Sequence, residues 1–211
     1  MRRSLIALAA LALCACSSDP SEPIDRIFDG KSLAGLRAFA QPGVDPNSLF
    51  RVENDELVVA GAANGYLATE RELGDLRIAF EWKWVTPGNS GFFISISGPD
   101  AIWPRTVEMQ LLVDRAGDLL ALGGFPMRKV DDAGFPPPGN AIVSIPHREG
   151  REKPVGQWNQ GEIAMKNGRV TVKVNDVLVN EAVVPAGERG RVAFEAEGGE
   201  IRFRNVVAHA D

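Results

Sequence analysis

The alternation of apolar and polar residues along short segments is the feature that most constrains this chain. Residues 76–84 carry an apolar side chain at every second position, namely Leu76, Ile78, Phe80, Trp82 and Trp84. Side chains of a β-strand point alternately to opposite faces, so this segment predicts a strand with one face in a core. Residues 170–175 repeat the pattern with three valines. The two tryptophans share a face with Phe80 and are therefore assigned to the core.

Two-residue turns join the predicted strands. Asn167-Gly168 is the preferred pair for a tight hairpin, and Asn175-Asp176 repeats the device with residues that tolerate positive φ. No run of 12 residues shows helical periodicity, although residues 45–50 are expected to form a single turn. About twelve short strands predict an all-β fold, a jelly-roll sandwich of two antiparallel sheets. Such sandwiches often curve, which leaves a trough where a sugar can lie.

One long connection interrupts the strand rhythm. Residues 125–157 contain three consecutive prolines, several charges and one short apolar run at residues 141–145. A connection of this length is usually functional or disordered, and the prolines make it stiff. We expect it to form a loop that walls one side of a cleft.

The first sixteen residues predict a lipoprotein signal peptide. Arg2 and Arg3 precede an apolar run at residues 5–13 that is too short to span a bilayer. Residues 13–16 resemble a bacterial lipobox and make Cys16 the expected site of lipidation. Cys14 fits this role less well because the bulky Leu13 precedes it. A plain secreted protein is the alternative.

The segment after Cys16 completes the expected organisation. Residues 17–23 read as a short polar tether, and residues 24–211 as one domain. Ser17, in place of aspartate, predicts sorting to the outer membrane of the bacterial envelope. No later segment is long and apolar enough to cross a bilayer, so the expected membrane contact is through the lipid anchor only.

Cysteine content and charge exclude several function classes. No cysteine follows Cys16, so the domain has no disulfide, no cysteine-based metal site and no cysteine nucleophile. The formal net charge is −5, and removal of Arg2 and Arg3 with the signal segment makes it more negative. Nucleic-acid binding requires a basic face and is therefore not expected. A neutral, polar small molecule fits this charge better.

Residues 107–112 form the strand that most resembles part of a site. Val107, Met109 and Leu111 alternate toward a core, which places Glu108 and Gln110 side by side on the opposite face. Two polar side chains on one face of an apolar strand indicate a possible site. An ordinary solvated face gives the same pattern, because half-buried strands alternate as a rule.

Eight segments that follow in one order carry a resemblance to a known family. They are residues 27–33 (IFDGKSL), 65–71 (GYLATER), 80–84 (FEWKW), 87–93 (PGNSGFF), 108–118 with its Glu-x-Gln strand and Ala-Gly-Asp, 153–159 (KPVGQWN), 174–180 (VNDVLVN), and 197–205 with its Glu-Gly-Gly and Phe-Arg-Asn. The chain resembles the 3-keto-disaccharide hydrolase-like family, which is common among bacterial lipoproteins. The resemblance spans nearly the whole predicted domain. It implies a concanavalin A-like sandwich and cleavage of glycosides oxidised to a ketone at C3, and other members are described as 3-keto-glucoside lyases or hydratases.

That chemistry requires a base, an acid and a group that stabilises an enolate. The resemblance suggests which residues supply these groups. Glu108 is the expected base, and Gln110 and Asn89 are expected to contact sugar hydroxyls or the ketone. Asp118 and Glu197 are the candidates for the acid.

The remaining candidates are assigned to substrate binding. Lys153 and Arg71 are expected to stabilise the enolate, and Trp158 or Tyr66 to stack on a sugar. Ordinary structural roles remain open for each residue: turn formation for Asn89, loop hydrogen bonds for Asp118 and Glu197, a surface ion pair for Arg71, and packing for Trp158.

No cofactor is predicted, although a divalent cation bound by carboxylates stays open. His147 and His209 lie too far apart in the sequence to indicate a metal pair.

The sequence also departs from the family pattern. Residues 195–198 read Glu-Ala-Glu-Gly where many relatives carry Gln-Ser-Glu-Gly, and Val113 stands where others carry aspartate. Three other classes stay open. A sugar-binding module of the same fold would use Asn89, Gln110 and Trp158 but tolerate loss of Glu108. A laminarinase-type glycosidase needs two closely spaced carboxylates on one strand, and a purely structural envelope lipoprotein needs no polar pocket.

Overall fold

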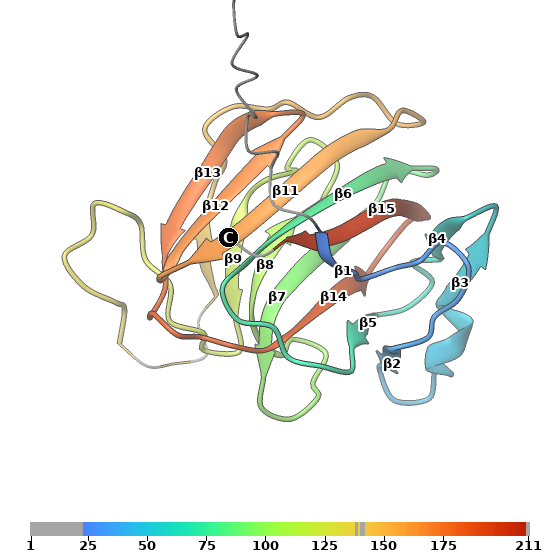
Figure 1. Ribbon diagram of the computed structural model, residues 1–211, viewed down its shortest axis with the longest axis horizontal. Coiled ribbons are helices and arrows are strands. Elements are labelled where there is room, and N and C mark those ends of the chain that lie inside the picture. Colours follow the sequence, from blue (N-terminus) through green and yellow to red (C-terminus); the bar gives the residue numbers. More distant parts are fainter. Residues whose placement is uncertain (1–22, 138, 140–141, 210–211) are drawn as a thin grey trace, which may run out of the picture.

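The computed structural model describes residues 23–209 except 138 and 140–141. The predicted signal segment and Cys16 lie outside the described residues. Two antiparallel sheets stack face to face, as Figure 1 shows. The expected all-β sandwich of two antiparallel sheets is confirmed, with fifteen strands among the described residues where about twelve were predicted.

One sheet has eight strands and the other has seven. In spatial order the eight-stranded sheet contains β13 (Val177–Val183), β12 (Arg169–Val174), β11 (Asn159–Lys166), β6 (Leu76–Trp84), β15 (Ile201–His209), β4 (Glu56–Val59) and β3 (Phe50–Glu53), with β1 (Pro23–Arg26) also paired to β15. The seven-stranded sheet contains β10 (Val143–Ile145), β9 (Leu119–Leu122), β8 (Arg105–Gln110), β7 (Gly91–Ser97), β14 (Arg191–Ala196), β5 (Gly65–Thr69) and β2 (Leu36–Ala40). Strands distant in sequence are therefore neighbours in space, notably β7 and β14.

Short turns connect the strands as the sequence predicts. Asn167 and Gly168 have φ of 48° and 78° between β11 and β12, and Asn175 and Asp176 have φ of 49° and 66° between β12 and β13. Positive φ at both central positions matches the twist of a hairpin. The expected turn near residue 45 is the 3₁₀ helix η1 (Pro46–Ser48), where the Asp45 carboxylate accepts a hydrogen bond from the Asn47 amide at 3.0 Å. No helix within the described residues is long and apolar enough to cross a membrane.

Aromatic rings from both sheets meet in the core. Phe80 of β6 stacks on Phe92 of β7 with 4.7 Å between ring centroids, and Phe92 contacts Phe194 of β14 at 5.3 Å. Trp82 and Trp84 are buried, as predicted. Because Phe92 and Phe194 point inward, the residues beside them on β7 and β14 point to the outer face. The ring contacts thus hold the backbone that carries that outer face in place.

The long connection at residues 125–157 packs at one edge of the sandwich. It contributes β10 to the seven-stranded sheet, and its Arg128 pairs through the backbone with Val183 of β13. Phe125, Pro136, Pro137 and Val143 of this connection line a hollow of about 300 Å³. The loop therefore walls a hollow, as expected. No carboxylate is among the residues that line this hollow, so it holds none of the predicted acids or bases.

Candidate active site

Three glutamates from two distant segments gather at the outer face of the seven-stranded sheet. Glu108 lies on β8, Glu195 lies on β14, and Glu197 follows the end of β14. Glu108 and Glu195 are 3% and 2% exposed, whereas Glu197 is half-buried. The cluster combines the predicted Glu108 and Glu197 with Glu195, which the sequence analysis did not select.

A glycine on the intervening strand makes room for this cluster. Gly91 of β7 pairs with Gln110 on one side, and the neighbouring Phe92 pairs with Phe194 on the other, which sets Glu195 beside Gly91. A Cβ atom on Gly91 would lie 2.4 Å from Glu108 Oε1, so the Glu108 carboxyl group rests directly over this glycine. Any other residue at position 91 would compete with Glu108 for that space.

Apolar and aromatic neighbours exclude water from the two inner glutamates. Glu108 pairs across the sheet with Phe93 and Leu120, and Glu195 pairs with Tyr66. Burial, followed by the charge of Glu197, raises the pKa of Glu108 to about 8. Burial likewise raises the pKa of Glu195 well above its ordinary value, with further contributions from the charges of Glu108 and Glu197. Desolvation disfavours the charged form of a carboxylate, and neighbouring negative charge adds to that effect.

Asn89 connects Glu197 to the start of β7. Its side-chain amide donates a hydrogen bond to Glu197, and its backbone exchanges hydrogen bonds of 2.8 and 2.9 Å with Gly198. Burial raises the pKa of Glu197, and the hydrogen bond from Asn89 opposes that shift. Three buried oxygen atoms of this site accept no hydrogen bond within the structure: Asn89 Oδ1, Glu108 Oε1 and Glu195 Oε2. Buried acceptors without a donor are rare in folded proteins, and an ionised carboxylate in such a setting is costly.

The other candidates on and near β8 have structural partners. Gln110 Oε1 accepts hydrogen bonds from the Leu111 and Leu112 amides at 3.0 and 2.9 Å, which caps the end of the strand. Asp118 is fully buried and accepts hydrogen bonds from His147 Nδ1 at 2.6 Å and from Arg115 Nε at 2.7 Å. This geometry favours an anchoring role for Asp118, which ties the turn before β9 to the long connection.

The predicted cations and aromatic platforms lie away from the glutamate cluster. Lys153 Nζ donates a hydrogen bond to the Trp158 carbonyl at 3.0 Å, and the Trp158 ring packs against Arg204 and Lys83 from the eight-stranded sheet. Arg71 follows the end of β5 and lines a separate hollow of about 270 Å³. The structure therefore brings Asn89, Glu108 and Glu197 together and separates Lys153, Trp158 and Arg71 from them.

Tyr66 is close to the cluster but closed to solvent. Its ring is fully buried and stacks on Phe39, and its hydroxyl donates a hydrogen bond to Asp100 at 2.8 Å. It therefore forms part of the apolar wall beside Glu195. Within the described part of the chain, no group of three or more His, Cys, Asp or Glu residues has an arrangement that could hold a metal ion.

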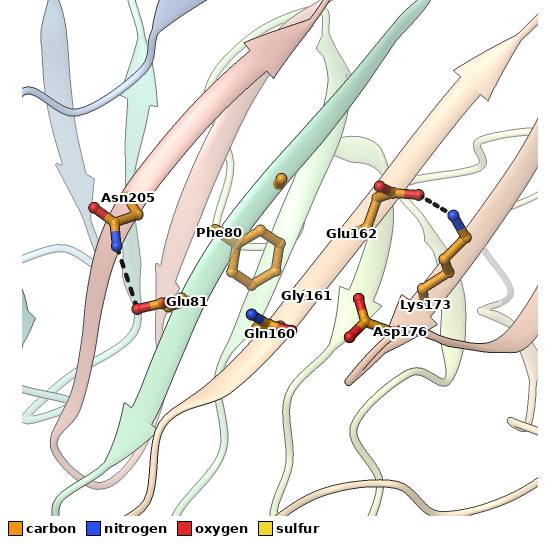
Figure 2. A pocket seen from close by; sticks show the side chains of 9 residues that line it. Phe80, Glu81, Gln160, Gly161, Glu162, Lys173, Asp176 and Asn205 are labelled. Carbon is orange, nitrogen blue, oxygen red and sulfur yellow. Dashed lines mark hydrogen bonds and ion pairs between the residues drawn. The ribbon is translucent and has the colours of Figure 1, made fainter. Parts of the chain in front are cut away.

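A second polar region occupies the opposite face of the molecule. A hollow of about 480 Å³ lies on the eight-stranded sheet, lined by Ala79, Phe80, Glu81, Gln160, Gly161, Glu162, Lys173, Asp176 and Asn205. Figure 2 shows partners for two of its three acids: Lys173 reaches Glu162 at 2.8 Å, and Asn205 donates to Glu81 at 3.3 Å. We call this region the paired hollow. Cations contact two of its acids, Lys173 and Arg77 at Glu162 and Arg204 at Glu81, whereas none contacts Glu108 or Glu195 among the described interactions.

Solved structures of low sequence identity share this fold. A Parabacteroides distasonis protein proposed to be a glycosyl hydrolase has 20% identity and a TM-score of 0.65, over 88% of this chain and 93% of its own. The carbohydrate-binding module CBM66 of Bacillus subtilis has 9% identity and a TM-score of 0.58, over 83% of this chain and 96% of its own. The β-glucanase of Bacillus licheniformis has 11% identity and a TM-score of 0.56, over 92% of this chain and 99% of its own. At these identities the likeness shows the fold alone.

Sequence comparison is more specific. No curated protein is detectably similar to this chain. The sequence profile of the 3-keto-alpha-glucoside-1,2-lyase-like domain, however, matches residues 24–208. The match covers all of the strands that carry the glutamate cluster. This chain therefore belongs to the family of 3-keto-alpha-glucoside-1,2-lyase-like domains.

Proposed function

We propose that this protein cleaves a glycoside that carries a ketone at C3, and that Glu108 is the base that removes the C2 proton. The observation that supports this proposal is the setting of Glu108. It is a buried carboxyl group over Gly91, on a strand held by core aromatic contacts, with a pKa raised to about 8. A base whose pKa lies near the working pH is the most effective in proton transfer.

The ketone makes this chemistry accessible to a carboxylate. It acidifies the C2–H bond, so a base can take that proton and leave an enolate. The electrons of the enolate then form the C1–C2 double bond and restore the ketone, while the bond from C1 to the departing oxygen breaks. Addition of water to the double bond completes a net hydrolysis, and without that addition the reaction is a lyase reaction. Asn89 and the half-buried Glu197 are the members of the site with exposed surface, so the substrate is expected to enter beside them.

Turnover of a panel of 3-keto-glucosides tests the proposal. The purified protein is compared with Glu108→Gln and with the matched control Glu162→Gln, which changes an acid of the paired hollow. We expect the Glu108 variant to lose about 100- to 10,000-fold in kcat/KM and the control to stay within about threefold of wild type. Equal activity of wild type and Glu108→Gln would exclude Glu108 as the base.

Carbohydrate binding without turnover is the second candidate, and the paired hollow favours it. That hollow has a volume of about 480 Å³, and its amide, carboxylate and ammonium groups suit hydroxyl-rich ligands. Under this alternative, calorimetry with the same glycosides shows saturable binding but no cleavage. Gln160→Ala would then weaken binding, and Glu108→Gln would leave it unchanged.

We also propose that the protein is anchored at the bacterial outer membrane through a lipid on Cys16. This proposal rests on the lipobox-like residues 13–16. Replacement of Cys16 by serine in the full chain should move the protein from the membrane fraction to the soluble fraction. Retention of the variant in the membrane fraction would contradict the proposal.

A further inference from the structure

The two inner glutamates are close neighbours on one face of the sheet. Glu108 reaches over Gly91 from β8, and Glu195 stands beside Gly91 on β14. Both are almost fully buried, and the structure offers neither Glu108 Oε1 nor Glu195 Oε2 a donor. An ionised carboxylate has only acceptor atoms, so two of them in this position would repel and remain unsatisfied.

One shared proton resolves both problems. It removes one of the two charges and converts one oxygen into a hydrogen-bond donor toward the other carboxylate. The third titratable group at the site is Glu197, whose charge faces both inner glutamates and whose side chain Asn89 holds. Tyr66, beside Glu195, already donates its hydroxyl proton to Asp100. The proton therefore belongs to the glutamates themselves.

We infer that Glu108 and Glu195 work as one pair, in which Glu108 takes the C2 proton and Glu195 gives its proton to the departing C1 oxygen. This inference rests on the proposed function. The C2–H bond breaks and an O–H bond forms on Glu108. As the C1–O bond breaks, the O–H bond of Glu195 breaks and the departing oxygen receives that proton. The pair starts and ends with one proton, and its transfer from Glu108 back to Glu195 restores the starting state.

Glu195→Gln separates the two halves of this reaction. The purified full chain is incubated with methyl and 4-nitrophenyl 3-keto-glucosides in D₂O, and NMR follows exchange at C2 and aglycone release. We expect C2 exchange to stay within about tenfold of wild type, while methanol release falls by about 100-fold or more. Release of 4-nitrophenolate should fall less, because this leaving group needs no proton. Equal losses for both aglycones, or loss of C2 exchange together with cleavage, would overturn the role of Glu195.

A titration distinguishes failure of this inference from failure of the proposed function. If wild type neither exchanges nor cleaves any 3-keto-glucoside, the proposed function fails. Carbon-13 NMR of the glutamate carboxyl groups then still tests the pair. We expect the two carboxyl groups of the wild type to lose their protons in two well-separated, coupled steps, and Glu195→Gln to leave a single step for Glu108, whereas Glu162→Gln keeps both steps. Independent, overlapping titrations of Glu108 and Glu195 in the wild type would refute the shared proton.

A conservative variant covers a failure of Glu195→Gln to fold. Glu195→Asp keeps the acid and retracts it by one methylene group. We expect it to release methanol more slowly than wild type and, if Glu195→Gln folds, faster than that variant. Thermal unfolding of each variant identifies losses that come from misfolding. A folded Glu195→Asp with wild-type release of methanol would also count against the role of Glu195 as the acid.

Discussion

The pKa values of acidic side chains shift in opposite directions on the two outer faces of the sandwich. In the paired hollow, Glu162 contacts Lys173 at 2.8 Å and Arg77 at 3.2 Å. Burial there would raise the pKa of Glu162, but the hydrogen bonds and charges of Lys173 and Arg77 outweigh it and lower the pKa. In the glutamate cluster, no cation contacts Glu108 or Glu195 among the described interactions, and the pKa values of both rise.

This difference separates acids that are compatible with stability from acids that are suited to chemistry. A paired, partly exposed carboxylate is stabilised in its ionised form by its cation and by water. Because its pKa is low, it is a weak base. A buried, unpaired carboxyl group destabilises the fold at neutral pH and binds a proton more tightly. Sites of this second kind persist where function requires them. The comparison therefore predicts that substitutions on the two faces have effects of different kinds.

The largest contrast is expected between two glycines, one on each sheet. In Gly91→Ala the new Cβ atom would lie 2.4 Å from Glu108 Oε1, so the carboxyl group must move. In Gly161→Ala it would lie 2.6 Å from Cζ of Phe80, a core ring. We expect Gly91→Ala to lose about 100-fold in turnover of a 3-keto-glucoside, and Gly161→Ala to lose about 1–3 kcal/mol of stability.

Urea unfolding and steady-state kinetics on both variants measure this contrast. Gly134→Ala is the control, because a Cβ atom there meets no other atom within 4 Å. Full activity of Gly91→Ala would contradict this prediction. So would a loss of activity in Gly161→Ala that exceeds the fraction of that variant that is unfolded.

The second prediction concerns stability as a function of pH. Burial, together with Glu197, raises the pKa of Glu108 to about 8 from an ordinary value of 4.5. The folded protein therefore keeps a proton that the unfolded chain releases above that ordinary value. This contribution to stability is complete below about pH 4.5 and is lost as the pH rises toward 8, at about 1 kcal/mol per pH unit for one proton.

Glu108→Gln removes this titration, so its stability should fall less steeply over the same range. The free energy of unfolding in urea, measured at several pH values, tests this. Glu162→Gln should keep the wild-type slope, because the pKa of Glu162 is lowered and its titration lies at more acidic pH. Parallel curves for wild type and Glu108→Gln would show that Glu108 ionises as easily in the folded state as in the unfolded state.

The contrast between the faces also explains what the sequence could predict. Alternation along residues 76–84 and 107–112 identifies buried strands and places Glu108 on an outer face, because both are local properties. Positive φ at Asn167 and Asn175 follows from residue type in the same way. Such signals determine each strand and its turns.

Strand order determines which residues meet, and it depends on pairing between distant segments. The sequence analysis did not select Glu195, although Phe194 and Ala196 flank it as core residues just as Val107 and Met109 flank Glu108. The available signal was the glutamate at a position where many relatives carry glutamine. Its partnership with Glu108 exists only because β7 lies between β8 and β14. Lys153 and Trp158 were expected at the site, yet they precede β11, which belongs to the other sheet. Asp118 accepts hydrogen bonds from His147 and Arg115, and the alternation of residues around Asp118 does not predict these contacts.

A third, smaller effect is expected from Glu197. Its charge adds to burial in raising the pKa of Glu108, so Glu197→Gln should lower that pKa. In the pH profile of kcat/KM, the acidic limb should then move to lower pH by less than about one unit, because burial remains the main cause. Glu181→Gln, on the eight-stranded sheet, is the control and should leave the limb in place. A limb that moves to higher pH in Glu197→Gln would show that Glu197 acts on Glu108 other than through its charge.

The smallest effect is expected in the paired hollow itself. Lys173→Met removes the contact of 2.8 Å with Glu162, but that acid keeps Arg77 at 3.2 Å, and the Lys173 side chain is 44% exposed. Exposed ion pairs contribute little, so the free energy of unfolding should change by less than about 1 kcal/mol, and less at high salt. Urea unfolding at low and high ionic strength measures the change. A loss of several kcal/mol, or a loss of activity, would mean that the charges of this face do more than neutralise one another. Ion pairing of the acids would then not be what distinguishes the paired hollow from the glutamate cluster.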